Sequence, residues 1–280
     1  MTQDHATAAP VCYRHPDRST LLSCSRCGRP ICSACSIDAA VGQRCPDCLR
    51  QEGAQRVVPT GPRRRQSAFA GAPATMIFIG LAVVFFLLGF IGLRDQLVEI
   101  FAQVNPLIAD GEWWRIFTVV LLHGSITHIL FNMWALYVLG PQIERGVGTW
   151  PFVTLFLASA AVGGAFAYWY DVWDGGPNQI AVGASGAIFG LFGIWLSWAL
   201  HRRNTMQGRA LLTQLIFLLA INAGIAFVFR NISWQAHLGG LIAGFVIGEI
   251  WARIQGPQAD TMRAWVGLAV AVLAALSVAV

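Results

Sequence analysis

Two residues far apart in this sequence have the chemistry of a nucleophile and its base. Ser185 lies in the stretch 182–190, VGASGAIFG, and His237 follows 52 positions later in another apolar segment. A serine hydroxyl becomes a nucleophile when an adjacent base accepts its proton. A lone serine in an apolar helix is more often a packing residue, because small residues dominate contacts between membrane helices. The catalytic interpretation therefore depends on elements that bring both side chains together.

Small residues recur every four positions around both candidates. They are Gly186, Gly190, Ala236, Gly240, Gly244 and Gly248. Two helices with such faces can approach until their backbones nearly touch. If both helices run in the same direction, Ser185 and His237 come to similar depth near one face of a membrane.

An acidic third member is missing from this pair. Asp171, Asp174 and Glu249 fall near helix ends or in loops. Since an aspartate normally orients the histidine of a catalytic triad, the sequence predicts a dyad. Phe189 is four residues after the serine, so its ring is expected to pack against His237, with lipid or core packing as the alternative.

A third apolar segment carries His123, His128 and Asn132. His128 and Asn132 are four residues apart and share one helical face. Two hydrogen-bond donors aimed at one point can stabilise a developing oxyanion. The alternative is that they join helices as polar contacts. The sequence has no His-Glu-x-x-His motif of a zinc protease.

The composition is that of a membrane protein. Hydrophobic residues make up 56% of the 280 residues and charged ones 12%, against about 25% in soluble domains. Seven stretches are candidate spanning helices: residues 75–93, 116–139, 151–170, 183–201, 210–229, 234–254 and 264–280. An amphipathic stretch at 97–104 predicts a short helix in the interface. We expect an all-α polytopic fold.

Arginines predict the orientation. With the N-terminus inside, nine arginines lie in or beside inner loops and three in outer ones, as the positive-inside rule requires. The protein is then a multi-pass protein of the plasma membrane, with a cytoplasmic N-terminus and the C-terminus outside. The polar residues 1–10 predict no signal peptide. We expect the lipid bilayer and membrane proteins as partners, and no nucleic acid.

All seven cysteines lie near the N-terminus. With one histidine they form four pairs of equal spacing: Cys12 and His15, Cys24 and Cys27, Cys32 and Cys35, and Cys45 and Cys48. Eight ligands are enough for two closed tetrahedral zinc sites of the structural kind. An odd number of cysteines argues against a disulfide scaffold. The alternative is a set of reduced structural or redox cysteines.

The membrane part, roughly residues 73–260, resembles the rhomboid family of intramembrane serine proteases. Its motifs are Glu112-x-Trp114-Arg115, His123, His128-x-x-x-Asn132, Gly183-Ala184-Ser185-Gly186 and Ala236-His237-Leu238-Gly239-Gly240. The resemblance implies a nucleophile, Ser185, and a general base, His237, without a catalytic cofactor. It implies an oxyanion hole from His128, Asn132 and the serine amide, with Gly183 nearby. It also implies a six-helix core, here followed by a seventh helix.

The N-terminal part resembles a B-box-type zinc finger, in which ligand pairs alternate between two ions. One zinc ion would be held by Cys12, His15, Cys32 and Cys35, and the other by Cys24, Cys27, Cys45 and Cys48. That family usually ends in histidines, whereas this chain ends its ligand series in cysteines. We therefore divide the chain into a zinc module at 1–50, a basic linker at 51–72 and a protease domain at 73–280.

The expected function is that of a serine endopeptidase that cleaves transmembrane segments of other membrane proteins. One alternative is a catalytically silent rhomboid-like factor that binds or traffics membrane proteins. A second is a zinc-module scaffold for which the membrane part is an anchor, although an anchor needs one helix. The zinc module is expected to bind a cytoplasmic partner, to gate activity or to stabilise the N-terminus.

Overall fold

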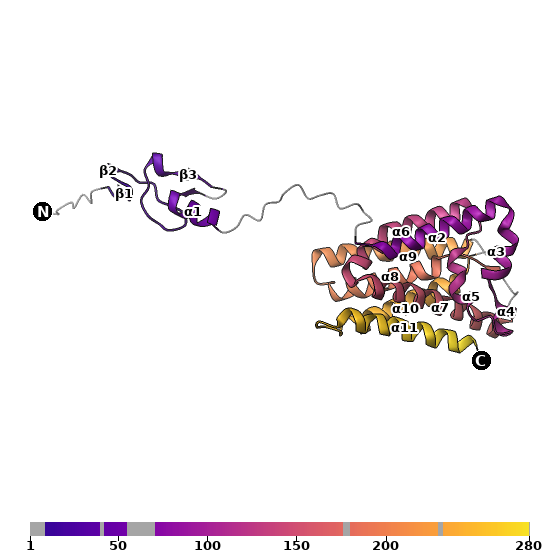
Figure 1. Ribbon diagram of the computed structural model, residues 1–280. Helices are drawn as coiled ribbons and strands as arrows, with labels where there is room; N and C mark the ends of the chain where they lie inside the picture. Colours follow the sequence, from indigo (N-terminus) through magenta and orange to yellow (C-terminus); the bar gives the residue numbers. More distant parts are fainter. Residues whose placement is uncertain (1–8, 40–41, 55–70, 176–179, 229–231, 280) are drawn as a thin grey trace. The chain divides into compact units, whose positions relative to one another are not determined.

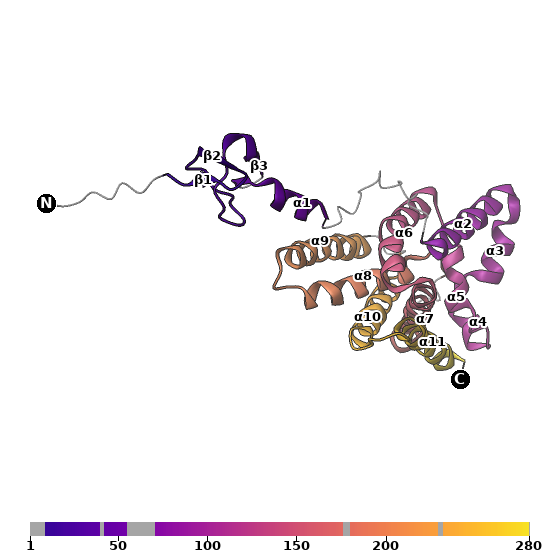
Figure 2. The ribbon, with the colours of Figure 1, turned by 60° about the vertical axis from the view of Figure 1, so that its left-hand side comes forward.

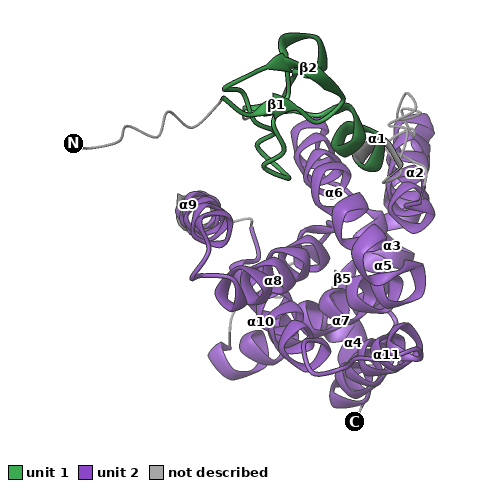
Figure 3. Cartoon of the chain, turned by 90° about the vertical axis from the view of Figure 1, so that its left-hand side faces the viewer, with its two compact units in different colours: residues 1–66 green, residues 67–280 purple. Residues whose placement is uncertain are grey.

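The computed structural model describes residues 9–39, 42–54, 71–175, 180–228 and 232–279. The chain divides into two compact units, residues 1–66 and 67–280 (Figure 3). Most of the linker expected at 51–72 lies outside the described residues, so the three-part division stays a prediction.

Unit 1 is a small module built from short strands and one helix (Figure 1). Strand β1 (Val11–Cys12) pairs with β2 (His15–Ser19), and β3 (Ile37–Asp38) pairs with β4 (Gln43–Arg44), both antiparallel. A 3-10 turn, η1 (Ser33–Cys35), and helix α1 (Pro46–Ala54) complete it. Its core consists of six cysteines and Ile31, with Tyr13 packed against them. Such a core buries little apolar surface, so a ligand held by the thiols would contribute much of the stability.

Unit 2 is a bundle of helices (Figure 2). It begins with α2 (Pro73–Leu88), the π-helical turn η2 (Gly89–Leu93) and α3 (Arg94–Phe101). Then come β5 (Gln103–Val104), α4 (Asn105–Ala109), α5 (Arg115–Thr118) and η3 (Val119–Leu121). The longer helices are α6 (Ile126–Val147), α7 (Thr149–Asp174), α8 (Ser185–His201), α9 (Met206–Val228), α10 (Trp234–Trp251) and α11 (Ala259–Val278), and β6 (Ile180–Ala181) precedes α8.

Helix α7 is the centre of the bundle, packed against α8, α10 and α11. In its most apolar window 67% of the residues are buried, against 6% for α2 with α3 and 11% for α9. Phe152, Leu155 and Phe156 fill the core around it. The outer helices instead expose apolar side chains, as helices do where hydrocarbon is the solvent.

Helices occur at all seven stretches expected to span. Among the described residues, four helical stretches are each long and apolar enough to cross a membrane. The bent pair 115–121 and 126–147 makes a fifth if it is counted as a single span. Helix α8 has 17 residues and falls short of that length. Helix α10 carries Gln235, His237 and Glu249, which lower its hydropathy. The two shorter or more polar helices are those that carry the candidate dyad.

The continuous helix expected at 116–139 is wrong. The chain leaves its first helical piece at Leu121 and restarts at Ile126, with a bend of 99°. Ser125 is the N-cap of α6, where its hydroxyl accepts a hydrogen bond from the His128 amide at 3.2 Å. A capping serine starts a new helix inside an apolar run. His123 therefore lies in the break and not on the helix of His128.

A short helix occurs in the stretch expected at 97–104, but it is α3, which begins at Arg94 and ends at Phe101, while Gln103 and Val104 form β5. Its place in the membrane interface stays a prediction. A break at Ile91 and Gly92 separates it from α2, and Gly92 has a φ of 98°. This backbone region favours glycine because a Cβ would crowd the following carbonyl.

Candidate active site

Ser185 is the first residue of α8, and the backbone before it is sharply turned. Gly183 has a φ of 130°, and its amide donates to the Val119 carbonyl at 3.0 Å. A glycine is required here, since a Cβ would lie 2.7 Å from the ring of His128. The amides of the first helical turn have no acceptor within their own helix. The hydroxyl of Ser185 therefore lies at a site that favours developing negative charge.

The glycines of α8 and α10 bring the two helices into backbone contact. A Cβ at Gly240 would collide with the carbonyl oxygen of Gly186, and one at Gly244 with that of Gly190. The paired positions increase together along both helices, so α8 and α10 are parallel. This confirms the close approach expected from the spacing of small residues.

His237 lies in the first turn of α10, close to Ser185. The Ser233 side chain caps this helix by accepting from the Ala236 amide at 3.3 Å. The His237 Nε2 is 2.8 Å from the Ser185 Oγ. This is hydrogen-bonding distance, so the imidazole can take the hydroxyl proton.

The ring of Phe189 stacks on the imidazole of His237. The ring centroids are 4.1 Å apart and the planes differ by 9°. Phe189 also meets Phe192 edge-on at 5.7 Å. The packing expected for Phe189 is therefore present, and it fixes the plane of the histidine.

The two side chains expected as oxyanion donors lie on α6, and one of them, His128, contacts Gly183. The His128 ring faces Gly183, two residues before the serine. The buried Asn132 side chain donates through Nδ2 to the His128 carbonyl at 2.9 Å, within its own helix. An amide group has two N–H donors, so Asn132 keeps one for another acceptor.

A family model for the rhomboid domain matches residues 110–254, which hold all of these side chains. The chain belongs to the rhomboid family. Rhomboid protease GluP of Bacillus subtilis (strain 168) is 39% identical over 175 residues, 61% of this chain and 33% of that protein. Putative rhomboid protease YdcA of the same organism is 39% identical over 143 residues, 51% of this chain and 69% of that one. Rhomboid protease AarA of Providencia stuartii is 28% identical over 200 residues, 62% and 69% of the two chains.

His123 of the rhomboid domain lines a pocket next to the site. Its ring is 5.1 Å from that of His128, and neither of its buried nitrogens has a hydrogen-bond partner among the described residues. The pocket has a volume of about 520 Å³ and reaches from Val182, next to Gly183, to Phe86 of α2 and Phe90 of η2. A mostly apolar hollow thus opens beside the residues around the dyad.

The loop before the bend is held by Arg115. This side chain is 3% exposed and donates to the Glu112 carboxylate and to the carbonyls of Ala102 and Glu99, at 2.6, 2.8 and 2.7 Å. Immediately after Ala102, strand β5 pairs with β6, and Gln103 lies opposite Ala181. Arg115 therefore helps to position the strand that leads into Gly183, which agrees with a structural role.

Sequence reasoning missed a buried carboxylate in the rhomboid domain. Glu144 is 1% exposed and accepts from the amides of Ala74 and Thr75 at 2.9 and 2.8 Å. The hydroxyls of Thr75 and Thr149 donate to it at 2.7 and 3.0 Å. It joins the starts of α2 and α7 to the end of α6, at the opposite end of α6 from His128. No local pattern marks it, because its partner Thr75 is 69 residues away.

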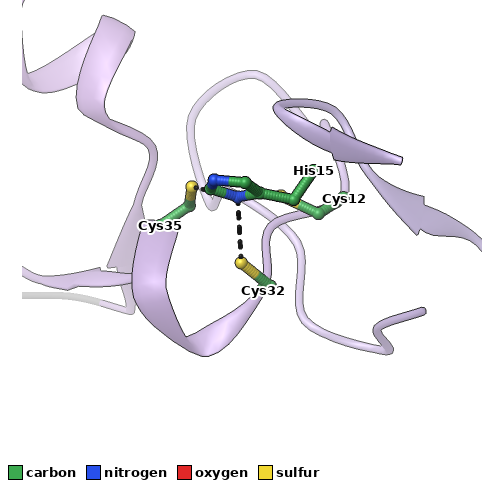
Figure 4. Close-up of side chains that lie close together, drawn as sticks. All are labelled: Cys12, His15, Cys32 and Cys35. Atoms are coloured by element: carbon green, nitrogen blue, oxygen red, sulfur yellow. Dashed lines mark hydrogen bonds between the residues drawn. The ribbon is translucent and has the colours of Figure 1, made fainter. Parts of the chain in front are cut away.

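Unit 1 holds two groups of side chains that could bind metal ions. One consists of Cys12, His15, Cys32 and Cys35 (Figure 4), the other of Cys24, Cys27, Cys45 and Cys48. Within each group the ligand atoms all lie within 4.8 Å of one another. In the first, the His15 Nδ1 is 3.5 Å from the Cys32 Sγ and 3.3 Å from the Cys35 Sγ. Three sulfurs with one nitrogen, and four sulfurs, are donor sets of structural zinc sites.

Backbone amides surround the sulfurs of these groups. Burial raises the pKa of the Cys24 thiol, but hydrogen bonds from backbone amides, that of Cys27 first, bring this pKa down to about 6. Cys12 has a pKa of about 6 for the same reasons. Both cysteines thus favour the thiolate, the form that binds metal.

Proposed function

We propose that this protein is an intramembrane serine endopeptidase, with Ser185 as nucleophile and His237 as general base. The observation that carries the proposal is the 2.8 Å distance between the Ser185 Oγ and the His237 Nε2. The relatives GluP and AarA are named as proteases. Because the chain spans only 33% of GluP, the activity is proposed for this chain from its own geometry.

The dyad would act in two steps. His237 takes the proton of the Ser185 hydroxyl as the oxygen attacks the peptide carbonyl carbon, and then gives it to the leaving amine. Water next loses a proton to His237 and attacks the acyl carbon. The bond between this carbon and the Ser185 oxygen then breaks, and His237 returns the proton to that oxygen, which restores the serine. Phe189 stacked on the ring substitutes for the orienting carboxylate of a triad.

The oxyanion would be held by three kinds of donor. The Ser185 amide lies at the start of α8, where its N–H is free and the helix dipole favours negative charge. The His128 ring lies beside Gly183, and Asn132 has its second N–H. The close fit between Gly183 and His128 keeps these donors on one side of the serine.

The substrates would be transmembrane segments of other membrane proteins. An intact helix hides its carbonyls in hydrogen bonds, so the cleaved segment must unwind, which favours small residues at the cut. The pocket lined by Phe86, Phe90 and His123 would take an apolar substrate side chain. Val98 lines the same pocket, so Val98→Phe is expected to shift the preference of a substrate library toward smaller side chains at one position. An unchanged profile would refute this use of the pocket.

The decisive experiment is cleavage of a single-pass model substrate by the purified full chain in detergent. Wild type is expected to cut and Ser185→Ala to be inactive, with a fluorophosphonate probe labelling wild type alone. Cleavage by the Ser185→Ala variant would refute the proposal. A folded wild-type chain that takes no probe would instead support the silent binding factor, which no observation on this chain favours.

We further propose that unit 1 holds two structural zinc ions in the two ligand groups. The nine-against-three distribution of arginines supports a cytoplasmic N-terminus and an outside C-terminus, and a plasma-membrane location is part of the same proposal. Protease protection of an N-terminal tag in sealed inside-out vesicles would refute that orientation. A cytoplasmic partner for the zinc module belongs to the same proposal.

A further inference from the structure

The two ligand groups of unit 1 differ in the solvent exposure of their cysteine residues. Cys12, Cys32 and Cys35 of the first group are at most 5% exposed. In the second group Cys24, Cys45 and Cys48 are also buried, at 4% or less. All seven cysteines are described, and Cys27 is the one that is exposed. An oxidant in water can therefore reach one sulfur of one group without unfolding.

Arg29 contacts the exposed sulfur and one of its neighbours. Its Nε donates to the Cys27 Sγ at 3.4 Å and its Nη2 to the Cys45 Sγ at 3.7 Å. The guanidinium lies 4.4 Å from the ring centre of Tyr13, and its Nη1 is 3.4 Å from an Asp47 carboxylate oxygen. These contacts hold the cation in place against the two sulfurs.

The same two sulfurs are close to each other. The Cys27 Sγ and the Cys45 Sγ are 3.8 Å apart. A disulfide needs about 2.05 Å between its sulfurs, so a small movement of the exposed Cys27 side chain would join them once oxidation has detached Cys27 from the metal.

We propose that the four-cysteine group is a peroxide-responsive site, in which Cys27 is oxidised first, forms a disulfide with Cys45 and releases its metal ion, while the Cys12 group keeps its own. The inference rests on the metal assignment proposed above and goes beyond it. It gives the zinc module a regulatory chemistry that is separate from proteolysis.

The reaction balances with hydrogen peroxide as the oxidant. The Cys27 thiolate attacks one peroxide oxygen, the O–O bond breaks, and sulfenic acid and hydroxide form. The Cys45 thiolate then attacks the Cys27 sulfur, the S–O bond breaks and a second hydroxide leaves. The two sulfurs together lose two electrons, which the peroxide gains. Only Cys24 and Cys48 would then remain to hold an ion that needs four ligands, so the ion would be released.

Charge favours the same site. Four thiolates around Zn²⁺ leave a net charge of −2, whereas three thiolates and a neutral histidine leave −1. More electron-rich sulfurs are the better nucleophiles, and nucleophilicity falls as basicity falls. Arg29 draws charge from Cys27 and Cys45, so it is a positioning residue that slows their oxidation in the metal-bound state.

The test uses the full chain in detergent, loaded with zinc. Metal analysis before oxidation tests the zinc assignment on its own, since a chain with no zinc would refute that assignment. Peroxide is then added, and zinc release is followed with a chromophoric chelator. We expect half of the zinc to leave at least about tenfold faster than the rest, and peptide mapping to find Cys27 joined to Cys45. Equal release rates, or a first disulfide among Cys12, Cys32 and Cys35, would overturn the proposal.

Variants separate this chemistry from simple loss of structure. Cys27→His keeps four ligands without the reactive thiol and is expected to lose the fast phase. Arg29→Gln is expected to speed the fast phase several-fold without changing the slow one. The matched control is Arg26→Gln, because Arg26 donates to a backbone carbonyl, that of Cys48, at 3.4 Å. If Arg29→Gln leaves the fast phase unchanged, or Arg26→Gln speeds it equally, the role of Arg29 is refuted, and the peptide map of the wild type still decides the role of Cys27.

Discussion

Phe189 and His237 lie ring on ring, with centroids 4.1 Å apart and planes within 9° of parallel. Among the described residues, no carboxylate hydrogen-bonds to His237. The stack therefore holds the imidazole plane while Nε2 faces the Ser185 Oγ at 2.8 Å. A flat apolar contact fixes the orientation of a general base without adding a charge to an apolar site.

This stack predicts the behaviour of Phe189→Leu. Leucine keeps most of the buried volume but has no ring, so the loss is mainly that of the aromatic contact, about 0.5–1.5 kcal/mol. We expect kcat to fall by about 2–10-fold with KM nearly unchanged, because the ring of His237 is less well aligned. Steady-state kinetics on a transmembrane substrate measure both.

Phe189→Tyr is the matched control, since it preserves the stacked ring. It should keep kcat near that of the wild type. Equal losses in the leucine and tyrosine variants would mean that the stack does not orient the base.

The glycine contacts between α8 and α10 predict a second outcome. Gly240→Ala places a Cβ against the Gly186 carbonyl oxygen, so the helices must separate. Overpacking of this kind costs about 1–3 kcal/mol, and it should also lower kcat strongly by parting Ser185 from His237. Thermal unfolding and cleavage assays report the two effects.

Gly224→Ala in α9 is the comparison, because a Cβ there meets nothing within 4 Å. It should leave stability equal or slightly raised, since alanine favours helix by about 1 kcal/mol over glycine. A Gly240→Ala variant as stable and active as this control would contradict the role of the close contact.

The donors proposed for the oxyanion give a third prediction. His128→Ala and Asn132→Ala should each lower kcat by about 10²–10³-fold if the side chain stabilises the transition state. KM should change little, because such donors act mainly on the transition state. If the residues only join helices, the unfolding temperature should fall while the folded fraction keeps its kcat.

The Ser185–His237 dyad could be predicted from the sequence because the residues that position it follow local, periodic patterns. Glycines and alanine every fourth residue predicted the close approach of the two helices, and the four-residue offset of Phe189 predicted its packing on His237. The bend before α6 was not predicted, because the apolar average over 116–139 hides it. Ser125, the N-cap that starts α6, was the available signal.

The Glu144 cluster could not be predicted in the same way. Glu144 is followed directly by Arg145, and such neighbouring charges are typical of a polar helix end. Its burial comes from the start of α2, which follows no pattern shared with α6. Such long-range polar contacts depend on the completed fold.

Glu144→Gln is therefore expected to lower stability and spare catalysis. The amide keeps one acceptor oxygen, but its NH₂ must face one of the backbone donors, the Ala74 amide or the Thr75 amide, and hydrogen bonds to a charged acceptor are lost. A loss of about 1.5–3 kcal/mol is expected, with kcat of the folded fraction unchanged because the dyad lies at the other end of the bundle. Asp110→Asn, which removes a charge from an exposed residue, should change neither. A kcat loss without a stability loss in Glu144→Gln would contradict this structural role.

Metal removal should unfold unit 1 and leave the activity of unit 2 unchanged. Chelation by a membrane-permeant zinc ligand is expected to unfold unit 1, because its core is built from six cysteines and Ile31 and the metal would supply most of its folding energy. Limited proteolysis should then cut within residues 9–54, whereas the zinc-loaded chain should resist. Cleavage of a model substrate should continue at the wild-type kcat, since Ser185 and His237 need no metal. Loss of cleavage on chelation, restored by zinc, would mean that unit 1 gates the rhomboid domain.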